Sequence, residues 1–319
     1  MKKTLVAIAA GLLAVTGAYA QTYPAKPVRM VVPWPAGGSN DVVGRVVAQK
    51  LSAAWGQQVV VDNRPGAAGV VGSELVARSP ADGYTIMVHS GTHVSNASLY
   101  KKLPYDTLKD FTPVMLIAAQ PTLLVTHPSL PVKSVQDLIR LARAQPGKVF
   151  YCSSGNGSAP HLSAALFTTM AKVSMEHVPY KGGGPALTAL MSGECQLMFG
   201  TMPTVISQVK SGRLRAVGIT SAKRSKLLPD LPTIGESGLP GYELSPWIAI
   251  FAPANLPRPI ADRIYNDVSR ILQSPDVVES LSFQGVEPML MKQDEFPEFV
   301  KSEHAKYARI VKASGAQID

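Results

Sequence analysis

The stretch VVPWPAGGSNDVVGR, residues 31–45, connects an apolar, strand-like segment to a helix-like pattern through a turn of Pro, Gly and Ser. We expect the strand to end at Val32 and the helix to begin near Asp41. Ser39 or Asn40 is then the N-cap of the helix. The glycines of the turn leave backbone N–H groups uncovered, and the first N–H groups of a helix carry about half a positive charge. This turn therefore predicts an anion site.

The same order of a short apolar run and a polar or glycine-rich turn recurs along the chain. It occurs in residues 28–34, 58–66, 85–91, 122–128, 148–158, 177–184, 195–203 and 214–221. Between most of these runs lie amphipathic segments with the i, i+3, i+4 spacing of a helix that packs on one face. Strands that are apolar on both faces and alternate with helices predict an α/β fold, in which mainly parallel sheets are flanked by helices.

Two long extended segments, residues 114–127 and 242–257, are interrupted by Pro. Because Pro cannot donate to a central ladder, we interpret them as edge or crossing segments between two lobes. The first lobe is then discontinuous, with residues 21–122 and 245–319, and the second lobe comprises residues 123–244. The helical C-terminal segment is expected to fold back on the first lobe. Since open parallel sheets bind ligands beyond the carboxyl ends of their strands, the polar turns predict a cleft between the lobes.

The N-terminal 20 residues have the features of a secretory signal peptide. They comprise MKK, the uncharged run 4–19, and small residues at Ala18 and Ala20 in the A-x-A spacing of a cleavage site. A permanent membrane anchor is the alternative, although the run is shorter than the roughly 20 apolar residues that a spanning helix needs. We therefore expect a secreted protein. Loss of Lys2 and Lys3 with the peptide lowers the net charge from +9 to about +7, which favours anionic partners.

Several functional classes lack their signatures in this sequence. The basic residues are scattered and no zinc-finger or aromatic RNA-binding motif occurs, which argues against nucleic acid as a partner. His89 and His93 are four residues apart in an expected strand end and loop, and no metal-ligand motif occurs, so we expect neither a metal nor a cofactor. No nucleophile elbow, P-loop or complete dinucleotide fingerprint occurs. A secreted α/β hydrolase or transferase that uses Ser158 with His161 is the alternative to a binding protein.

Candidate ligand contacts come from the turns that follow strands. Backbone or hydroxyl donors are expected at Gly37, Gly38, Ala67, Ser90, Thr92, Ser154, Gly155, Asn156, Ser158, Gly182 and Gly183. Lys181 supplies charge to an anion or points to solvent, and Asp41 stabilises its helix or meets an ammonium group of the ligand. Trp34 and Trp247 either wall the cleft or belong to the core. A site lined by amides suits the reversible capture of a small carboxylate.

Two cysteines, Cys152 and Cys195, occur in a chain that we expect in an oxidising compartment. Cys152 lies near the end of one strand-like run, and Cys195 lies at the start of another. If the two strands are parallel neighbours, the cysteines lie about 10 Å or more apart at roughly 3.3 Å per residue, which is beyond disulfide reach. We therefore expect free, buried thiols, with a disulfide as the alternative.

The chain contains several long motifs in order. They are VVPWPAGGSNDVVGRVVAQKL (31–51), GQQVVVDNRPGAAGVVGSELVARSPADGYTIMV (56–88), PHLSAALF (160–167), HVPYKGGGPALTALMSGECQLMF (177–199), GRLRAVGITSAKRSKLLPDLPTIGESGLPGYE (212–243) and PWIAIFAPANLP (246–257). In these motifs the chain resembles the periplasmic solute receptors of tripartite tricarboxylate transporters, the Bug or TctC-type family. The resemblance implies a type II periplasmic-binding-protein fold, in which two α/β lobes close over a carboxylated metabolite and pass it to a two-component membrane permease.

The resemblance also implies roles for individual turns. In such receptors the loops that match residues 34–41 and 154–158 hold the carboxylate of the ligand, largely through main-chain amides and ordered water. This implies contacts from Ala36, Gly37, Gly38, Ser39, Gly155, Asn156 and Ser158, with Tyr180, Lys181, Gly182 and Gly183 at the border of the site. The chain departs from the family where Trp34 replaces the more usual Phe, where Ala189 replaces a common acidic residue, and where GAAG (66–69) replaces Gly-Ala-Gly-Gly.

We therefore expect a receptor without catalysis for a small carboxylate. Its ligand is a dicarboxylate, a tricarboxylate, an acidic amino acid or an aromatic acid. We expect a monomer that delivers this ligand to membrane permease subunits. A ligand sensor for a membrane signalling partner is a further alternative, because it differs from an uptake receptor only in the protein that it contacts.

Overall fold

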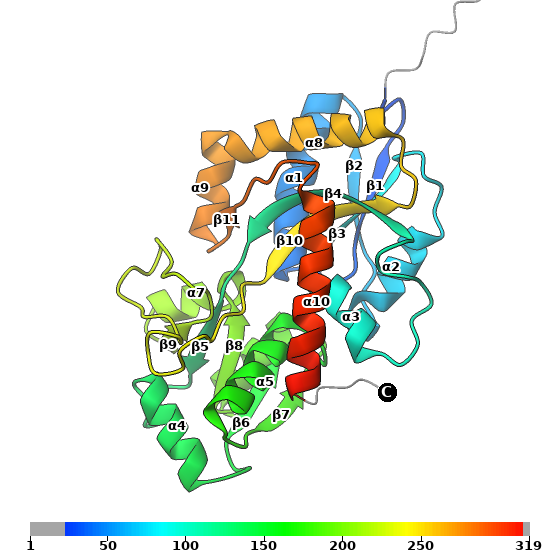
Figure 1. The fold of residues 1–319 in the computed structure, drawn as a ribbon. Helices are drawn as coiled ribbons and strands as arrows, with labels where there is room; N and C mark the ends of the chain where they lie inside the picture. Colours follow the sequence, from blue (N-terminus) through cyan, green and yellow to red (C-terminus); the bar gives the residue numbers. More distant parts are fainter. Residues whose placement is uncertain (1–22, 315–319) are drawn as a thin grey trace, which may run out of the picture.

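The computed structural model describes residues 23–314. The expected signal peptide, residues 1–20, lies outside the described residues. The described chain forms two β-sheets, each with its own helices, one above the other in Figure 1. Within the described range, none of the helices has the length and apolar character needed to cross a membrane.

The first sheet has the strand order β11-β4-β10-β3-β1-β2. Its strands are β1 (Val28–Val32), β2 (Val59–Asn63), β3 (Thr85–Ser90), β4 (Phe111–Ala119), β10 (Trp247–Pro253) and β11 (Glu287–Pro288). β1 pairs in parallel with β2 and β3, whereas β10 pairs antiparallel with β3 and β4, and β11 pairs antiparallel with β4. The sheet is therefore mixed, although β1, β2, β3 and β4 all run in one direction.

Helices cover both faces of the first sheet (Figure 1). They are α1 (Ser39–Trp55), α2 (Val70–Ala77), α3 (Thr92–Leu99), α8 (Arg258–Gln273), α9 (Pro275–Phe283) and α10 (Phe296–Ser314), with a short 3₁₀ turn η1 (Ala67–Gly69). Successive residues of β1 face opposite sides: Met30 and Val32 pack with α1 and α8, and Val31 packs with α2, α3 and α10. Both faces are buried, which explains the continuous apolar runs and confirms the predicted α/β fold.

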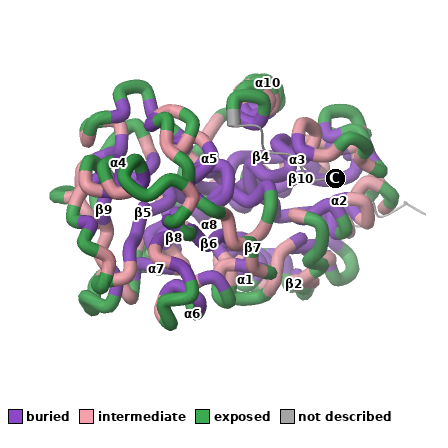
Figure 2. Tube along the Cα trace, turned by 90° about the horizontal axis from the view of Figure 1, so that it is seen from below, coloured by how far each residue is buried: buried purple, intermediate pink, exposed green. Residues whose placement is uncertain are grey.

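The second sheet has the strand order β7-β6-β8-β5-β9. Its strands and helices are β5 (Thr122–Thr126), α4 (Val135–Ala144), β6 (Phe150–Ser153), α5 (Ala159–Ala171), β7 (Glu176–Pro179), α6 (Gly183–Ser192), β8 (Leu197–Thr201), α7 (Met202–Lys210) and β9 (Arg215–Ile219). β6 pairs in parallel with β7 and β8, and β5 pairs antiparallel with β8 and β9. α4 and α5 cover one face, and α6 and α7 cover the other. Figure 2 shows the buried residues concentrated in the strands between these helices.

The chain crosses between the sheets twice, from β4 to β5 and from β9 to β10, as predicted. The two crossings are hydrogen-bonded to each other, because the Gln120 amide donates to the Pro246 carbonyl at 2.8 Å. The expectation of edge strands is wrong: β10 lies between β3 and β4, and β5 lies between β8 and β9. Pro121 and Pro246 occupy the joints outside the strands, Pro113 lies beside an irregularity of the β4–β10 ladder, and Pro253 is the last residue of β10.

The C-terminal helix α10 contacts both lobes and not only the first. Tyr307 and Ile310 of α10 share a buried apolar cluster with Leu162 of α5. The Trp247 indole N–H donates to Glu303 Oε2 of α10 at 2.8 Å, which fixes the helix to the second crossing. The expectation that this segment folds back on the first lobe is thus incomplete, because its apolar stripe continues beyond the first sheet. Figure 1 shows α10 alongside both sheets.

Cys152 and Cys195 form a disulfide, so the expectation of free thiols is wrong. Cys152 lies in β6, where it is the register partner of Met198 in β8. Cys195 lies in the bend before β8, because that strand begins only at Leu197. The bend returns the chain toward β6 and brings the two Cα atoms to 5.9 Å, within normal disulfide range.

Candidate functional site

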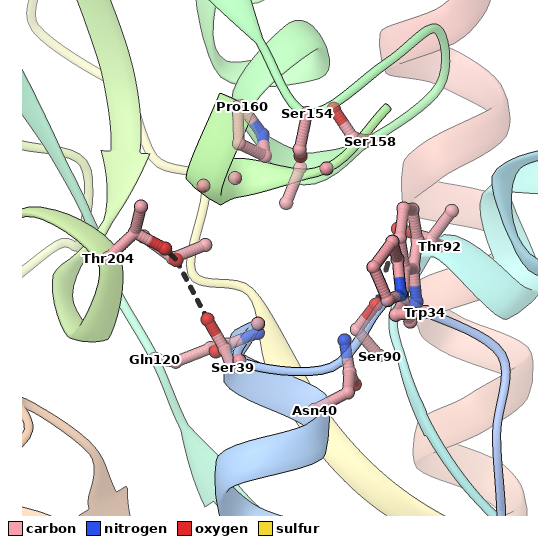
Figure 3. A pocket seen from close by; sticks show the side chains of 18 of the residues that line it. Trp34, Ser39, Asn40, Ser90, Thr92, Gln120, Ser154, Ser158, Pro160 and Thr204 are labelled. Atoms are coloured by element: carbon pink, nitrogen blue, oxygen red, sulfur yellow. Dashed lines mark hydrogen bonds between the residues drawn. The ribbon is translucent and has the colours of Figure 1, made fainter. Parts of the chain in front are cut away.

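An inner cavity of about 190 Å³ lies between the two sheets. It is lined from the first lobe by Trp34, Pro35, Ala36, Gly37, Gly38, Ser39, Asn40, Ser90, Thr92 and Gln120, and from the second lobe by Ser154, Ser158, Ala159, Pro160, Gly182, Gly183, Gly184, Pro185, Met198, Thr201 and Thr204. Figure 3 shows Ser39 and Asn40 of α1 opposite Ser154 and Ser158. None of these lining residues has an ionisable side chain.

An outer cavity of about 520 Å³ adjoins the inner one. The two share Trp34, Pro35, Ser154 and Gly182, and the outer cavity is also lined by Pro65, Gly66, Ala67, Ala68, Gly69, Tyr100, Gly155, Asn156, Tyr180 and Lys181. The lobes touch at this division, since a Cβ atom on Gly182 would lie 3.3 Å from Pro35 Cγ. The site is therefore an uncharged inner compartment followed by a wider outer one that contains Lys181.

Five helices begin at the inner cavity. The first residues of α1, α3 and α5 line it, as do the first residue of α6 and the N-cap Thr201 of α7. Each helix N-terminus has unpaired N–H groups and the equivalent of about half a positive charge. The cavity is therefore electropositive without a cationic side chain, which is the arrangement that binds anions at helix N-termini.

The N-terminus of α1 differs by one or two residues from the prediction. Gly38 is the N-cap, with φ −79° and ψ 168°, and no side chain caps the helix. Ser39 and Asn40 lie in the first turn, and their amides have no acceptor among the described residues. The Ser39 hydroxyl cannot cap the helix because it donates to Thr201 Oγ1 of the second lobe at 2.7 Å. The two free amides are thus available to a ligand in the cavity.

Asp41 lines neither cavity, which matches the first of its two predicted roles, support of its helix, and not contact with a ligand ammonium group. Its carboxylate accepts hydrogen bonds from the Gly37 amide, Arg45 Nε and Asn63 Nδ2, each at 2.9 Å. Burial alone would raise the pKa of Asp41, but these hydrogen bonds outweigh it and lower the pKa. Asp41 therefore holds the shape of the turn, and its bond with Gly37 removes that amide from the set of free donors.

Trp247 also lies outside both cavities. Its side chain is buried, packs among Phe251, Phe296 and Phe299, and donates to Glu303. Of the two roles that the sequence left open for Trp247, a wall of the cleft or a core residue, its position matches the core residue.

The loop before α5 supplies the opposite side of the cavity. Ser158 is the N-cap of α5, and its hydroxyl donates to the Gly155 carbonyl at 2.6 Å and accepts from the His161 amide. The amides of Asn156 and Ala159 have no acceptor among the described residues. The free amides of Ser39 and Asn40 from the first lobe and of Ala159 from the second thus belong to residues that line the inner cavity, whereas Asn156 lines the outer one.

Hydroxyl groups connect the lobes at the base of the cavity. Besides the bond from Ser39, Thr201 Oγ1 lies 2.8 Å from Thr204 Oγ1. At the start of α6, a Cβ atom on Gly183 would lie 3.0 Å from Thr204 Oγ1, so a larger residue there would require Thr204 to shift. Thr201, Thr204 and Gly183 all belong to the second lobe. The bond from Ser39 to Thr201, together with the contact of Pro35 with Gly182, describes an arrangement in which the two lobes are closed on each other.

Most of the predicted contact residues line one of the two cavities. Those at the inner cavity are Trp34, Ala36, Gly37, Gly38, Ser39, Ser90, Thr92, Ser154, Ser158, Gly182 and Gly183, and those at the outer cavity are Ala67, Gly155, Asn156, Tyr180 and Lys181. The sequence did not identify Gln120, Thr201 or Thr204. The signals for these residues are the Gln-Pro joint at the first crossing and a strand that ends in Thr-Met-Pro before a helix.

The 3₁₀ turn η1 at the outer cavity contains two strained residues. Ala67 and Ala68 have φ values of 48° and 53°, in the left-handed region that L-residues other than glycine avoid. We expect Ala68→Gly to raise the free energy of unfolding by about 1 kcal/mol, because glycine has no Cβ atom to strain. Urea denaturation measures this change.

Ala53→Gly is the matched control, because Ala53 is exposed in the regular helix α1. There the same substitution is expected to cost about 0.5–1 kcal/mol. Equal effects of the two substitutions would contradict the strain assigned to η1.

Three buried histidines, His89, His93 and His161, and the half-buried His177 predict a loss of stability in mild acid. Burial lowers the pKa of His161 to about 4 and that of His93 to about 3, burial together with His161 lowers that of His177 to about 3, and burial with His93 also lowers that of His89. Below pH 6.5 the unfolded chain takes up protons that the native protein excludes, so the free energy of unfolding falls as the pH decreases. For His161 alone the expected loss by pH 4 is about 3 kcal/mol.

Denaturant unfolding at pH 7, 6, 5 and 4.5 tests this prediction. The lowered pKa of Asp41 affects stability only at lower pH, because an unfolded Asp titrates near pH 4. A constant free energy of unfolding across these four pH values would show that the histidines are not buried in the neutral form.

Two α/β lobes that enclose a cavity lined by amides define a two-lobed solute-binding protein. The chain belongs to the TctC family, the tripartite tricarboxylate transporter family receptors, whose family model matches residues 43–316. It is similar to Protein BugT of Bordetella pertussis, with 38% identity over 301 residues that cover 94% of this chain and 92% of BugT. The resemblance noted in the sequence motifs is thus confirmed.

Solved structures show the same fold. The chain is similar to the structure of R. palustris Rpa4515 with adipate, with a TM-score of 0.89, 38% identity, and coverage of 93% of this chain and 100% of that chain. It is also similar to MatC (Rpa3494) from Rhodopseudomonas palustris with bound malate, with a TM-score of 0.84, 30% identity, and coverage of 91% and 100%. Two lobes and a carboxylate ligand are therefore features of proteins similar to this chain.

Proposed function

We propose that this protein is a periplasmic receptor that captures a small carboxylate between its lobes and delivers it to the permease of a tripartite tricarboxylate transporter. The observation that carries the proposal is the inner cavity, at which five helices begin and in which no ionisable side chain lies. The unpaired amides of Ser39, Asn40 and Ala159 would hold one carboxylate, directly or through water.

The donor set suits capture and release. A hydrogen bond to a charged group contributes about 1.5–3 kcal/mol, so three or four amides offset much of the desolvation of a carboxylate. Because no cationic side chain forms an ion pair in the inner cavity, release needs only the separation of the lobes. This combination suits a transport receptor that must give up its ligand.

The two compartments suggest the kind of ligand. The inner cavity of about 190 Å³ is below the roughly 300–1,000 Å³ of typical drug-sized sites, so it accepts one small acidic end. The outer cavity, with Asn156, Tyr180 and Lys181, would accept the remainder of the ligand. The similar proteins hold adipate and malate, which supports a dicarboxylate as the first candidate, with a tricarboxylate, an acidic amino acid or an aromatic acid as the others.

We further propose that residues 21–122 with 245–319 and residues 123–244 move as two bodies about the crossings. Ligand binding would favour the closed arrangement, in which Ser39 reaches Thr201 and Pro35 lies against Gly182. Small-angle scattering is expected to show a smaller radius of gyration with bound ligand. An unchanged radius at saturation would contradict hinge closure.

We propose no catalysis at this site. In a serine hydrolase the nucleophile donates to its general base. Here the Ser158 hydroxyl donates to the Gly155 carbonyl instead, at 2.6 Å, and His161 Nδ1 accepts from the Gly157 amide. Activated attack by Ser158 would need both hydrogen bonds to be broken.

A thermal-shift screen of mono-, di- and tricarboxylates, followed by calorimetry, tests the proposed function. We expect adipate, malate or a related acid to raise Tm and to bind with one-to-one stoichiometry, because a ligand that binds only the native state stabilises it. The diamide of the same acid is the matched control, and we expect at least 100-fold weaker binding of the diamide. Equal binding of acid and diamide, or binding of cationic compounds alone, would contradict the proposal.

A further inference from the structure

Three aromatic rings stack behind the loop of residues 154–158. Tyr151 and His177 are register partners on the parallel strands β6 and β7, and their rings lie 4.9 Å apart at 15°. His161, in the first turn of α5, stacks on His177 with ring centroids 4.2 Å apart at 7°. We call these three side chains the ring stack.

Two hydrogen bonds tie the loop to the ring stack. The Gly157 amide donates to His161 Nδ1 at 3.0 Å. The Ser153 hydroxyl lies 2.6 Å from His177 Nε2 and accepts from the Gly155 amide at 3.1 Å. The loop that places Asn156 at the outer cavity is therefore held on both sides of that residue.

The hydrogen bond from Gly157 requires neutral His161, because a protonated Nδ1 would be a second donor facing the amide. The ionisable groups in contact with His161 are His177 and, beyond it in the stack, Tyr151, with Glu176 acting on Tyr151 from β7. Burial lowers the pKa of His161 to about 4, so the acceptor is intact at neutral pH. Neither histidine lines the inner or the outer cavity, so any effect on a ligand must act through the loop.

We propose that His161 and His177 are positioning residues, which fix the loop of residues 154–158 so that its free amides face the ligand. The proposal rests on the proposed function, since it concerns the same amides. Ser153 transmits the contact of His177 to Gly155, and His161 fixes Gly157 directly. Without these contacts, the backbone amides of residues 154–158 would no longer be held in the orientation that the ligand needs.

Two variants of His161 separate its hydrogen bond from its packing. His161→Phe keeps a stacked ring but leaves the Gly157 amide without an acceptor, and we expect about ten-fold or greater loss of affinity for adipate or malate. His161→Asn loses the ring but places Oδ1 close to the position of Nδ1, and we expect affinity within about three-fold of the unmodified protein. A purely structural role predicts the reverse order, because the ring fills more buried volume.

The pH dependence supplies a second readout. Affinity of the unmodified protein should fall toward pH 4 more steeply than that of His161→Asn, because the amide oxygen does not titrate. The titration of the ligand itself affects both proteins equally, so the difference between their pH profiles reports on His161.

His127→Asn is the matched control, since His127 also pairs with a serine of the second lobe but lies outside both cavities. We expect no change in affinity or pH profile for this control.

Hydrogen–deuterium exchange of residues 153–162 without ligand tests the positioning independently of binding. We expect at least ten-fold faster exchange in His161→Phe and near-normal exchange in His161→Asn. If no carboxylate of the thermal-shift screen binds the unmodified protein, the proposed function fails and the exchange rates alone decide the positioning role. Unchanged exchange and affinity in His161→Phe, or equal losses in both variants, would overturn the proposal.

Discussion

Ser39→Asp is expected to abolish carboxylate binding without destabilising the protein. Ser39 is the first residue of α1 and faces the inner cavity, so the new carboxylate would occupy the space in which we place the acidic end of the ligand. Two like charges in contact cost several kcal/mol, which corresponds to at least about a 100-fold loss of affinity. Calorimetry with adipate or malate measures this loss.

The Ser39→Asp substitution is expected to affect stability in the opposite direction from affinity. An acidic residue in the first turn of a helix contributes about 0.3–1 kcal/mol of stability, so Tm should stay constant or rise. Ser39→Asn is the matched control: it is close in size, lacks the charge, and also removes the serine hydroxyl that donates to Thr201. We expect it to lose no more than about ten-fold in affinity. Comparable binding by Ser39→Asp and the unmodified protein would place the ligand elsewhere.

Removal of the disulfide is expected to have the largest effect on stability. Cys152 and Cys195 are 43 residues apart, and closing a loop of that length restricts the unfolded chain by about 4 kcal/mol in the chain-entropy model. We expect the double substitution to Ala to lower the free energy of unfolding by about 2–4 kcal/mol in urea denaturation. A thiol titration of the unmodified protein under denaturing, non-reducing conditions should find no free thiol.

The disulfide also lies close to the binding loop, since Cys152 is followed directly by Ser153 and the loop 154–158. We expect the ligand-bound fold to persist in the double Ala variant, with affinity changed less than stability, because the loop is also held by the ring stack. A loss of stability below about 0.5 kcal/mol would contradict the loop-closure argument.

The turns could be predicted from the sequence because the backbone conformation of a turn depends on the residues within it. Gly37 has φ 80° and Gly182 has φ 117°, so a glycine is needed at both positions for backbone reasons alone. The strand runs and the alternating helices likewise follow from apolar periodicity, which reports local burial on both faces. This local information was sufficient for the α/β fold, and most of the residues predicted from it line one of the two cavities.

Contacts between distant segments could not be predicted in the same way. The bond of Ser39 to Thr201 depends on where β8 ends, and the disulfide depends on where β8 begins. An error of one or two residues in either bound moves the side chain out of contact. Asp41 illustrates a second limit, because its three hydrogen-bond donors come from a turn, a helix and β2. The sequence alone does not distinguish a charged residue that contacts a ligand from one that supports the loop around the site.

The position of the ligand in a crystal structure of the protein with adipate or malate is the most direct test of the anion site. We predict one carboxylate in the inner cavity, within hydrogen-bond distance of the amides of Ser39, Asn40 or Ala159, or joined to them by one water. A carboxylate bound only by Lys181 in the outer cavity, or outside both lobes, would contradict the central role of the helix N-termini.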